Sequence, residues 1–128
     1  MTSGYTLKNL REVEDSAAKH GLSEHQEARF PRDELGVQEL GIALIGVKPG
    51  QRQPFAHRHN EAEEVYVVVS GSGRIKLDDE VVELREMDAL RLSPGVTRMA
   101  EAGPDGLELL AFGSRHQGDA EVVPGFWD

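Results

Sequence analysis

The sequence predicts an all-β protein, either a barrel or a sandwich, and two observations lead to this prediction. Short runs of β-branched and aliphatic residues recur along the chain, and turn residues such as Gly, Pro and Asp separate them at a fairly even spacing. In the clearest runs, apolar and polar residues alternate with a period of two, which places successive side chains on opposite faces of a strand. Helical patterns are a minor feature and lie near the N-terminus.

The N-terminal part of the chain predicts a short helix or an irregular arm, followed by two strands. Asn9 with Glu12 three residues later resembles a capping box, and Gly21 is suited to end a helix. Few apolar residues lie between them, so a short turn or an irregular arm fits the segment almost equally well. Strands are expected over residues 26–30 and 37–48.

The rest of the chain predicts a series of strands joined by turns. The alternation is clearest where Ile75 and Leu77 face one side while Arg74 and Lys76 face the other. Asp78-Asp79-Glu80 is typical of a hairpin turn, and we expect further turns at Gly71-Ser72-Gly73 and at residues 102–106. The expected strands cover residues 53–59, 64–70, 75–77, 82–84, 90–92, 96–100 and 107–112.

Size and charge limit the organisation of the protein and the partners it can bind. A chain of 128 residues is close to the commonest size of one domain, so we expect a single domain over residues 1–128. The net charge of -9 makes binding to nucleic acid or to an anionic membrane unfavourable, because both of these partners are polyanions. We therefore expect a small-molecule ligand, with neither nucleic acid nor membrane as a partner.

Three further features bear on where the protein works. The chain has no cysteine, which excludes disulfides and thiolate metal sites and is compatible with a reducing compartment. The N-terminus is polar, without the basic patch and apolar run of a signal peptide. The longest apolar stretch, Val65 to Val69, is far too short to cross a bilayer. We expect a cytoplasmic protein.

One segment carries residues suited to metal chemistry. On an extended strand, the period of two places the imidazoles of His57 and His59 on one face, and Glu64 follows after a span long enough for a turn. A histidine at a strand end is more often an ordinary surface residue, but two histidines with a carboxylate favour a site for a divalent metal. Such a set suits Fe, Mn, Ni, Co or Zn, and we expect no organic cofactor.

The same alternation predicts residues that would line a ligand pocket around this site. Gln53 and Phe55 share the parity of the two histidines, and Tyr66 shares the parity of Glu64. The pocket would then combine aromatic walls with a few polar groups, as small-molecule sites usually do. Val65, Val67 and Val69 would face the other side of their strand, which suggests that both faces of this strand are covered.

These residues resemble the first motif of the cupin family. That motif runs from a glycine, here Gly50, through a His-x-His pair and a glutamate to a second glycine, here Gly71. The first spacer is one residue longer than usual, and the rest is in register. In cupins the two histidines and the glutamate are metal ligands inside a jelly-roll barrel, so the resemblance implies this role for His57, His59 and Glu64.

The resemblance covers about residues 37–113. It implies a cupin-type jelly-roll β-barrel core over this range, with a short N-terminal helix or arm and a C-terminal arm. The C-terminal arm holds large apolar residues that are expected to cover a sheet edge of the same chain or to reach a partner subunit: Val122, Val123, Phe126 and Trp127. Together with the valines described above, these residues suggest a homodimer.

The second cupin motif departs from the pattern at one ligand. After Ser93-Pro94-Gly95, where cupins usually supply a histidine as fourth ligand, this chain has Arg98. A guanidinium stays protonated and cannot ligate a metal. Arg98 therefore either binds the carboxylate or phosphate of a small ligand, pairs with Glu64 in place of a metal, or points outward. The site has three protein ligands, or it holds no metal.

Three functions are compatible with these features, and the reaction stays unassigned. The first is a metal-dependent enzyme, either a dioxygenase or an isomerase, in which a bound metal polarises or activates the substrate. The second is a binding protein without chemistry that holds a small acid, with or without a metal, and a metal-free ligand-binding cupin is one form of it. The third is a cupin similar to sugar isomerases or epimerases, in which a histidine acts as general base beside a tyrosine. A cupin fold by itself does not choose among them.

Overall fold

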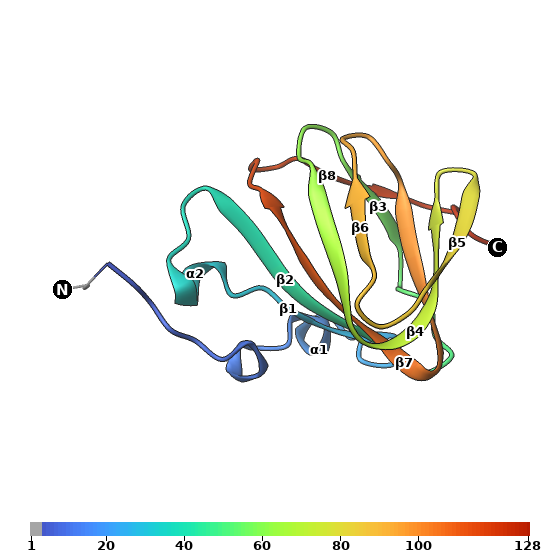
Figure 1. Ribbon diagram of the computed structural model, residues 1–128, viewed down its shortest axis with the longest axis horizontal. Coiled ribbons are helices and arrows are strands. Elements are labelled where there is room, and N and C mark those ends of the chain that lie inside the picture. Colours follow the sequence, from blue (N-terminus) through green and yellow to red (C-terminus); the bar gives the residue numbers. More distant parts are fainter. Residues whose placement is uncertain (1–3) are drawn as a thin grey trace.

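The computed structural model describes residues 4–128 and shows the predicted all-β architecture, a curled antiparallel sheet with very short helices (Figure 1). The first three residues, part of the polar N-terminus that argues against a signal peptide, lie outside the described residues. In chain order the elements are η1 (Leu10–Glu12), α1 (Ser16–Lys19), β1 (Gln26–Arg29), α2 (Arg32–Leu35), β2 (Leu40–Val47), β3 (Ala56–His59), β4 (Glu64–Leu77), β5 (Glu80–Leu84), β6 (Ala89–Leu92), β7 (Arg98–Ser114) and β8 (Ala120–Val123).

Two long strands, β4 and β7, connect the two halves of the barrel. The first half of β4 pairs with β6 and with the second half of β7, which in turn pairs with β2, and β1 pairs with β2. The second half of β4 pairs with β5 and with the first half of β7, and β7 then meets β3, which pairs with β8. The two halves face each other in Figure 1 because both long strands bend between them.

The turns expected at Gly71-Ser72-Gly73 and at residues 102–106 are wrong, because both segments lie inside the bent strands β4 and β7. The pairing of these two strands shifts register between Val68 and Ser70 and again between Gly71 and Gly73. At Gly73 an added Cβ would lie 2.1 Å from a backbone carbonyl oxygen of β7, so only glycine fits this close approach. The glycines that suggest turns in the sequence instead let two continuous strands bend.

In the N-terminal region the structure follows the second alternative, an irregular arm with short helical turns. The expected helix over residues 9–21 is replaced by η1 and α1, and a further short helix, α2, which the sequence analysis missed, precedes β2. The arm before η1 projects away from the barrel (Figure 1). Within residues 4–128, no helix is long and apolar enough to span a membrane.

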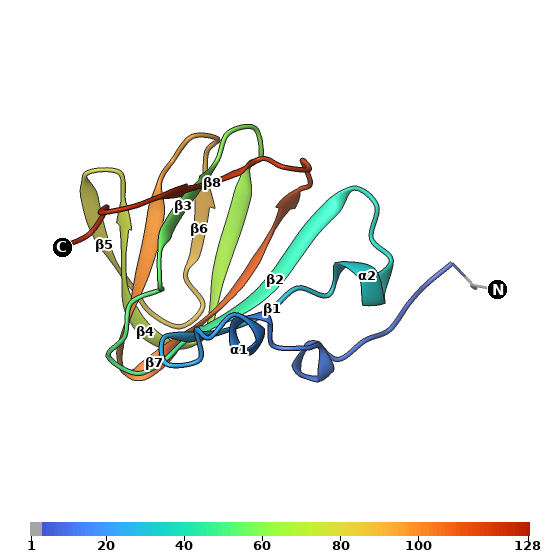
Figure 2. The same ribbon diagram turned by 180° about the vertical axis from the view of Figure 1, so that it is seen from behind.

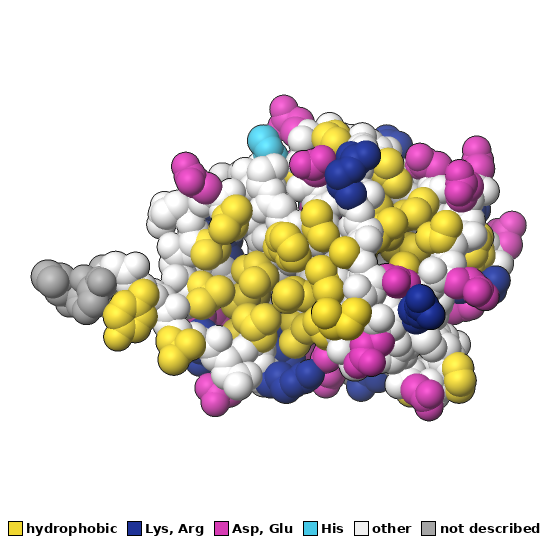
Figure 3. Space-filling view, in the orientation of Figure 1, with side chains coloured by type: hydrophobic (Ala, Val, Ile, Leu, Met, Phe, Trp, Pro, Cys, Tyr) yellow, Lys and Arg dark blue, Asp and Glu magenta, His cyan; other side chains and the backbone are white. Residues whose placement is uncertain are grey.

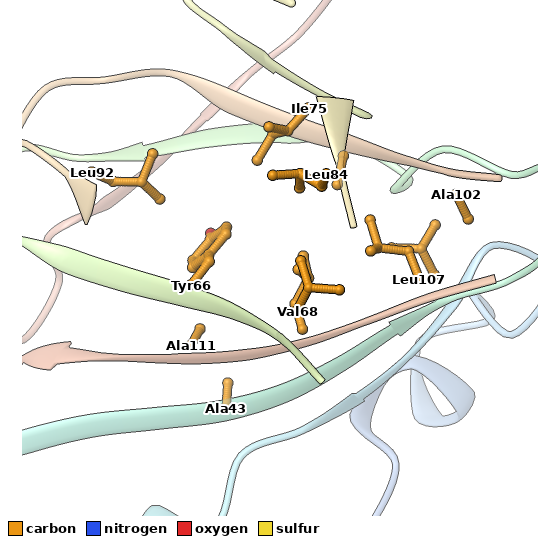
Figure 4. Packing of buried hydrophobic residues seen from close by; sticks show 12 residues of the cluster. Ala43, Tyr66, Val68, Ile75, Leu84, Leu92, Ala102, Leu107 and Ala111 are labelled. Atoms are coloured by element: carbon orange, nitrogen blue, oxygen red, sulfur yellow. The ribbon is translucent and has the colours of Figure 1, made fainter. Parts of the chain in front are cut away.

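The core lies between the two halves of the sheet (Figure 4). Tyr66 and Val68 from β4 point into it together with Ile75 from the second half of the same strand. Burial of each large aliphatic side chain stabilises the fold by about 1.5–3 kcal/mol. Glu64 lies two residues before Tyr66 and therefore shares the inward face of β4. The alternation predicted for this strand is confirmed, and it places a carboxylate at one end of the core.

The C-terminal segment covers a sheet edge of its own chain, which was one of two alternatives for it. β8 pairs antiparallel with β3 along its full length, and Figure 2 shows the segment running beside β3. Beyond β8, the ring of Trp127 lies 4.1 Å from the guanidinium carbon of Arg52, and the ring of Phe126 lies 4.5 Å from Lys76 Nζ. These contacts hold the C-terminal end of the chain against the outer surface of the barrel.

Candidate metal centre

The strand β3, the loop after it and the start of β4 bring together the three residues expected to bind a metal. His57 and His59 lie on the same face of β3, and Glu64 is the first residue of β4. Each offers one ligand atom, and these three atoms lie within 4.8 Å of one another, with all three residues half-buried. A single strand, turn and strand unit therefore forms the group, as the spacing in the sequence predicts.

The geometry inside the group leaves two electron-rich atoms facing each other. His59 Nε2 lies 3.3 Å from Glu64 Oε1. The rings of His57 and His59 are nearly perpendicular, at 89°, with centroids 5.2 Å apart. A carboxylate oxygen and an unprotonated imidazole nitrogen repel each other at this distance, so a proton or a metal ion between them is required for a favourable contact.

His57 is held in the neutral form. Burial lowers the pKa of His57 to about 3, and the positive charge of Arg98 and the neighbouring His59 act in the same direction. At neutral pH this imidazole therefore keeps a free lone pair, which is the form that binds a divalent metal. The electrostatics of the site match the chemistry expected of a ligand.

Arg98 points into the same site. It lies opposite His57 in the pairing of β3 with β7, and its side chain is fully buried. Its Nη2 donates to Glu64 Oε1, its Nη1 donates to the Val96 carbonyl oxygen at 2.8 Å, and its Nε lies 3.3 Å from the Tyr66 hydroxyl oxygen. The outward alternative is wrong, and the ion pair with Glu64 is the arrangement observed.

Tyr66 is a neutral polar group at the inner end of this cluster. Burial raises the pKa of Tyr66 to about 12, although the positive charge of Arg98 acts against this rise. The hydroxyl oxygen accepts a hydrogen bond from Arg98, so the phenol keeps its own proton for donation. Tyr66 therefore lies beside Glu64 on the same face of β4, as the alternation in the sequence predicts.

The other two residues expected in the pocket are placed differently. The chain bends at Pro54 and Phe55, and β3 begins only at Ala56, so the alternation on which this prediction rests is interrupted. Gln53 is buried, and its side-chain oxygen accepts from the Ala100 N–H at 3.0 Å, which ties two segments of the barrel together. Phe55 is 42% exposed. Their roles in ligand binding stay predictions.

Sequence reasoning missed one residue of this site, Asp119. It lies just before β8, and its carboxylate accepts the N–H groups of Glu61 at 2.8 Å and Ala62 at 2.9 Å. Its Oδ2 also lies 3.6 Å from His59 Nδ1. Burial acts to raise the pKa of Asp119, but the backbone hydrogen bonds from this loop and the neighbouring His59 together outweigh burial and lower the pKa. No spacing in the sequence links this aspartate, 60 residues away, to His59.

With the barrel and the His-His-Glu group in place, the sequence comparison decides the family. The family model of the cupin domain matches residues 43–111, which is more than half of the chain. The chain belongs to the cupin family. Among curated proteins, none matches this cupin.

Solved structures resemble this cupin over nearly its whole length. A cupin protein from Bacteroides fragilis aligns with a TM-score of 0.72 and 22% identity, covering 98% of this chain and 93% of the other. A sugar phosphate isomerase of the cupin superfamily from Silicibacter pomeroyi aligns with a TM-score of 0.73 and 17% identity, covering 92% and 82%.

A larger protein contains a similar barrel. Oxalate decarboxylase from Bacillus subtilis aligns with a TM-score of 0.75 and 21% identity, covering 96% of this cupin but only 33% of the decarboxylase chain. At such identities the likeness establishes the fold, and function has to be argued from the residues of the site.

Proposed function

We propose that this cupin binds one divalent metal ion through His57, His59 and Glu64, and that a small anionic molecule occupies the positions that the protein leaves open on the metal. The observation that carries this proposal is the convergence of two imidazoles and one carboxylate within 4.8 Å. This donor set with open positions suits Fe, Mn, Ni, Co or Zn. A bound metal of this kind supplies a Lewis acid that polarises an oxygen of the ligand.

The residues present fit a metal ion. His57 is neutral, and the close approach of His59 Nε2 to Glu64 Oε1 is favourable with a metal ion, or a proton, between the two atoms. Imidazole and carboxylate ligands also suit the borderline and hard divalent metals of the proposal. Arg98 does not ligate, but it donates to Glu64 Oε1, the oxygen that also faces His59, so a metal ion would bind Glu64 through Oε2 or share Oε1 with Arg98. Three protein ligands are therefore available to the metal.

The neighbours of the ligand set support an anionic ligand. The fully buried guanidinium of Arg98 supplies positive charge beside Glu64, and the Tyr66 hydroxyl can donate a hydrogen bond. These two groups would orient a carboxylate or phosphate, with Gln53 and Phe55 as outer contacts. If the protein is an enzyme, we propose a metal-dependent isomerase or dioxygenase, and the reaction stays unassigned.

One observation favours a second candidate, a metal-free cupin that binds a small acid. Arg98 already provides a counter-charge for Glu64, as a metal ion would. The related alternative, a sugar isomerase or epimerase with a histidine base, is supported less well. A general base works best with a pKa near the operating pH, and the pKa of His57 is lowered to about 3.

We further propose that two copies associate through an apolar face of the sheet, called here the β2–β7–β4 face. The strand register aligns outward side chains in two rows across the strands, and Figure 3 shows hydrophobic side chains gathered over this region. Within this face Leu40 is 60% exposed and Phe112 is 40% exposed. A contiguous apolar surface of this kind is typical of an interface. The face consists of Leu40, Ile42, Val65, Val67, Ala89, Leu110 and Phe112, with the buried Leu44 in the same row as Leu110 and with Arg91 at the edge beside Val65.

Two further expectations stay proposals. We propose that residues 4–128 form one domain, because β4 and β7 run through both halves of the barrel. We also propose a cytoplasmic location, with which the lack of cysteine is compatible.

The metal proposal is tested by the metal content of the purified, untagged protein, measured by inductively coupled plasma mass spectrometry after chelator treatment and reloading. We expect about one equivalent of metal in the wild type and less than about a tenth in Glu64→Gln, because a neutral amide is a weak ligand. Glu61→Gln is the matched control, since Glu61 is exposed in the adjacent loop. A wild-type protein that stays metal-free after reloading overturns the proposal and favours the metal-free candidate.

A further inference from the structure

Asp119 is a buried carboxylate next to the ligand set but outside it. Its side chain is 2% exposed, and it lies in the segment between β7 and β8. It approaches His59 at Nδ1, at 3.6 Å, while Glu64 approaches the same ring at Nε2, at 3.3 Å. The imidazole therefore lies between two carboxylates, one on each nitrogen.

This placement determines which nitrogen of His59 is free to bind a metal. A neutral imidazole has one N–H and one lone pair, and the surroundings decide which nitrogen carries the proton. In the metal-free site Glu64 and Asp119 compete for this proton, whereas with Glu64 engaged by a metal ion, Asp119 is the carboxylate that favours the proton on Nδ1. The lone pair is then on Nε2, which faces Glu64 and the other ligand atoms.

We propose that Asp119 is the positioning residue of the metal centre, holding His59 as the Nδ1–H tautomer so that Nε2 is presented to the metal; this inference rests on the proposed function. The separation of 3.6 Å is longer than a hydrogen bond, so in this structure the carboxylate acts on the ring through its charge. A metal on Nε2 makes the Nδ1–H a stronger donor and strengthens this attraction.

Asp119 itself is held firmly enough for this role. Its carboxylate accepts two backbone N–H groups of the loop after β3, and its carbonyl oxygen accepts the Asn60 N–H at 3.3 Å. The next residue, Ala120, pairs with His59 in the β3–β8 ladder. The same residue thus fixes the loop that joins the metal ligands and faces one of the ligands directly.

The test uses zinc as the probe, because it is diamagnetic and leaves histidine signals observable. In the zinc-loaded wild type, long-range 1H–15N correlation spectra should show His59 coordinated through Nε2 with a protected Nδ1–H. Asp119→Asn keeps the size of the side chain and one acceptor for the loop. We expect it to weaken zinc binding roughly tenfold or more and to expose the Nδ1–H of His59 to exchange.

Asp88→Asn is the matched control. It removes the same charge from a carboxylate that accepts the Arg85 N–H at 2.9 Å, in a turn outside the ligand set. We expect its zinc affinity and its His59 signals to equal those of the wild type. Unfolding temperatures of both variants separate loss of structure from loss of positioning.

The outcomes distinguish this inference from the proposed function. Coordination of His59 through Nδ1 in the wild type overturns the inference while the metal proposal stands, and this reading does not depend on how any variant folds. Unchanged His59 signals in Asp119→Asn also overturn it, even with weaker zinc binding, because the residue then only supports the loop. A wild type that does not bind zinc or any other divalent metal overturns the proposed function and this inference with it.

Discussion

At the scale of single residues, the chemistry of the site depends on the partners of Glu64. In this structure its carboxylate pairs with the buried guanidinium of Arg98, and it lies 3.3 Å from His59. Arg98 has no exposed surface, so it needs a negative partner inside the protein. A metal ion that binds Glu64 therefore shares this carboxylate with Arg98, which adds a repulsive positive charge next to the metal.

Replacement of Arg98 by histidine should convert the three-ligand site into a four-ligand site. Position 98 lies opposite His57 in the strand register, so the new imidazole would enter the same group. We expect Arg98→His to tighten metal binding roughly tenfold or more, because it adds a ligand and removes a cation. The measurement is the dissociation constant of zinc, by competition with a chromophoric chelator.

Arg98→Gln is the control for this prediction, because it removes the cation without adding a good ligand. Loss of one partner of a buried ion pair should destabilise the metal-free protein by roughly 3–5 kcal/mol. Metal binding should restore part of this stability, since the metal replaces the counter-charge of Glu64. If Arg98→His and Arg98→Gln bind zinc with equal affinity, position 98 does not supply a fourth ligand.

At the scale of elements, the site depends on the bend of β4 against β7. The bend lets the first half of β4 present Glu64 and Tyr66 at one end of the core, while the second half builds the opposite wall with Ile75. Glycine residues make this bend feasible. Gly71 has a φ of 77°, and an added Cβ there would lie 2.0 Å from the Gly106 carbonyl oxygen.

Gly71→Ala should therefore be far more damaging than the same change at Gly95. Gly95 also has a positive φ, of 88°, but an added Cβ there has nothing within 4 Å. We expect Gly95→Ala to cost only the left-handed strain of about 1–2 kcal/mol. Gly71→Ala should lower the free energy of unfolding by more than about 4 kcal/mol, or prevent folding, because two backbones must separate. Urea unfolding checks this, and equal losses would show that the close approach is not limiting.

At the scale of the whole molecule, the two faces of the first half of β4 have different surroundings. Tyr66 and Val68 point into the core, whereas Val65 and Val67 belong to the outward β2–β7–β4 face. The sequence suggests that both faces of this strand are covered. Within one chain this is true only of the inner face. The outer face supports the proposed homodimer.

A charge in the middle of this face should separate the copies. Phe112 lies between Ile42 and Val65 in the strand register, so Phe112→Glu places a carboxylate at the centre of the face. By analytical ultracentrifugation we expect the wild type at twice the 14.1 kDa mass of one chain and the variant at 14.1 kDa. Val81→Glu, an exposed apolar position on β5, should stay dimeric. A wild type that sediments as a single chain contradicts the proposal.

The sequence by itself determined the features that depend on neighbours along the chain. Alternation with a period of two decided which side chains of β4 face the core, because successive residues of any strand point to opposite faces. The His-His-Glu group was also predictable, since its members lie in one strand, turn and strand unit and need no distant segment to bring them together.

Only the tertiary structure decided the features that depend on distant segments. The pairing of Arg98 with Glu64 and the approach of Asp119 to His59 join residues that are 34 and 60 positions apart. The continuity of β4 through Gly71 and Gly73 likewise depends on the backbone of β7. Local sequence patterns predict the geometry of one segment. The packing of segments against each other determines which charged side chains come together inside the barrel.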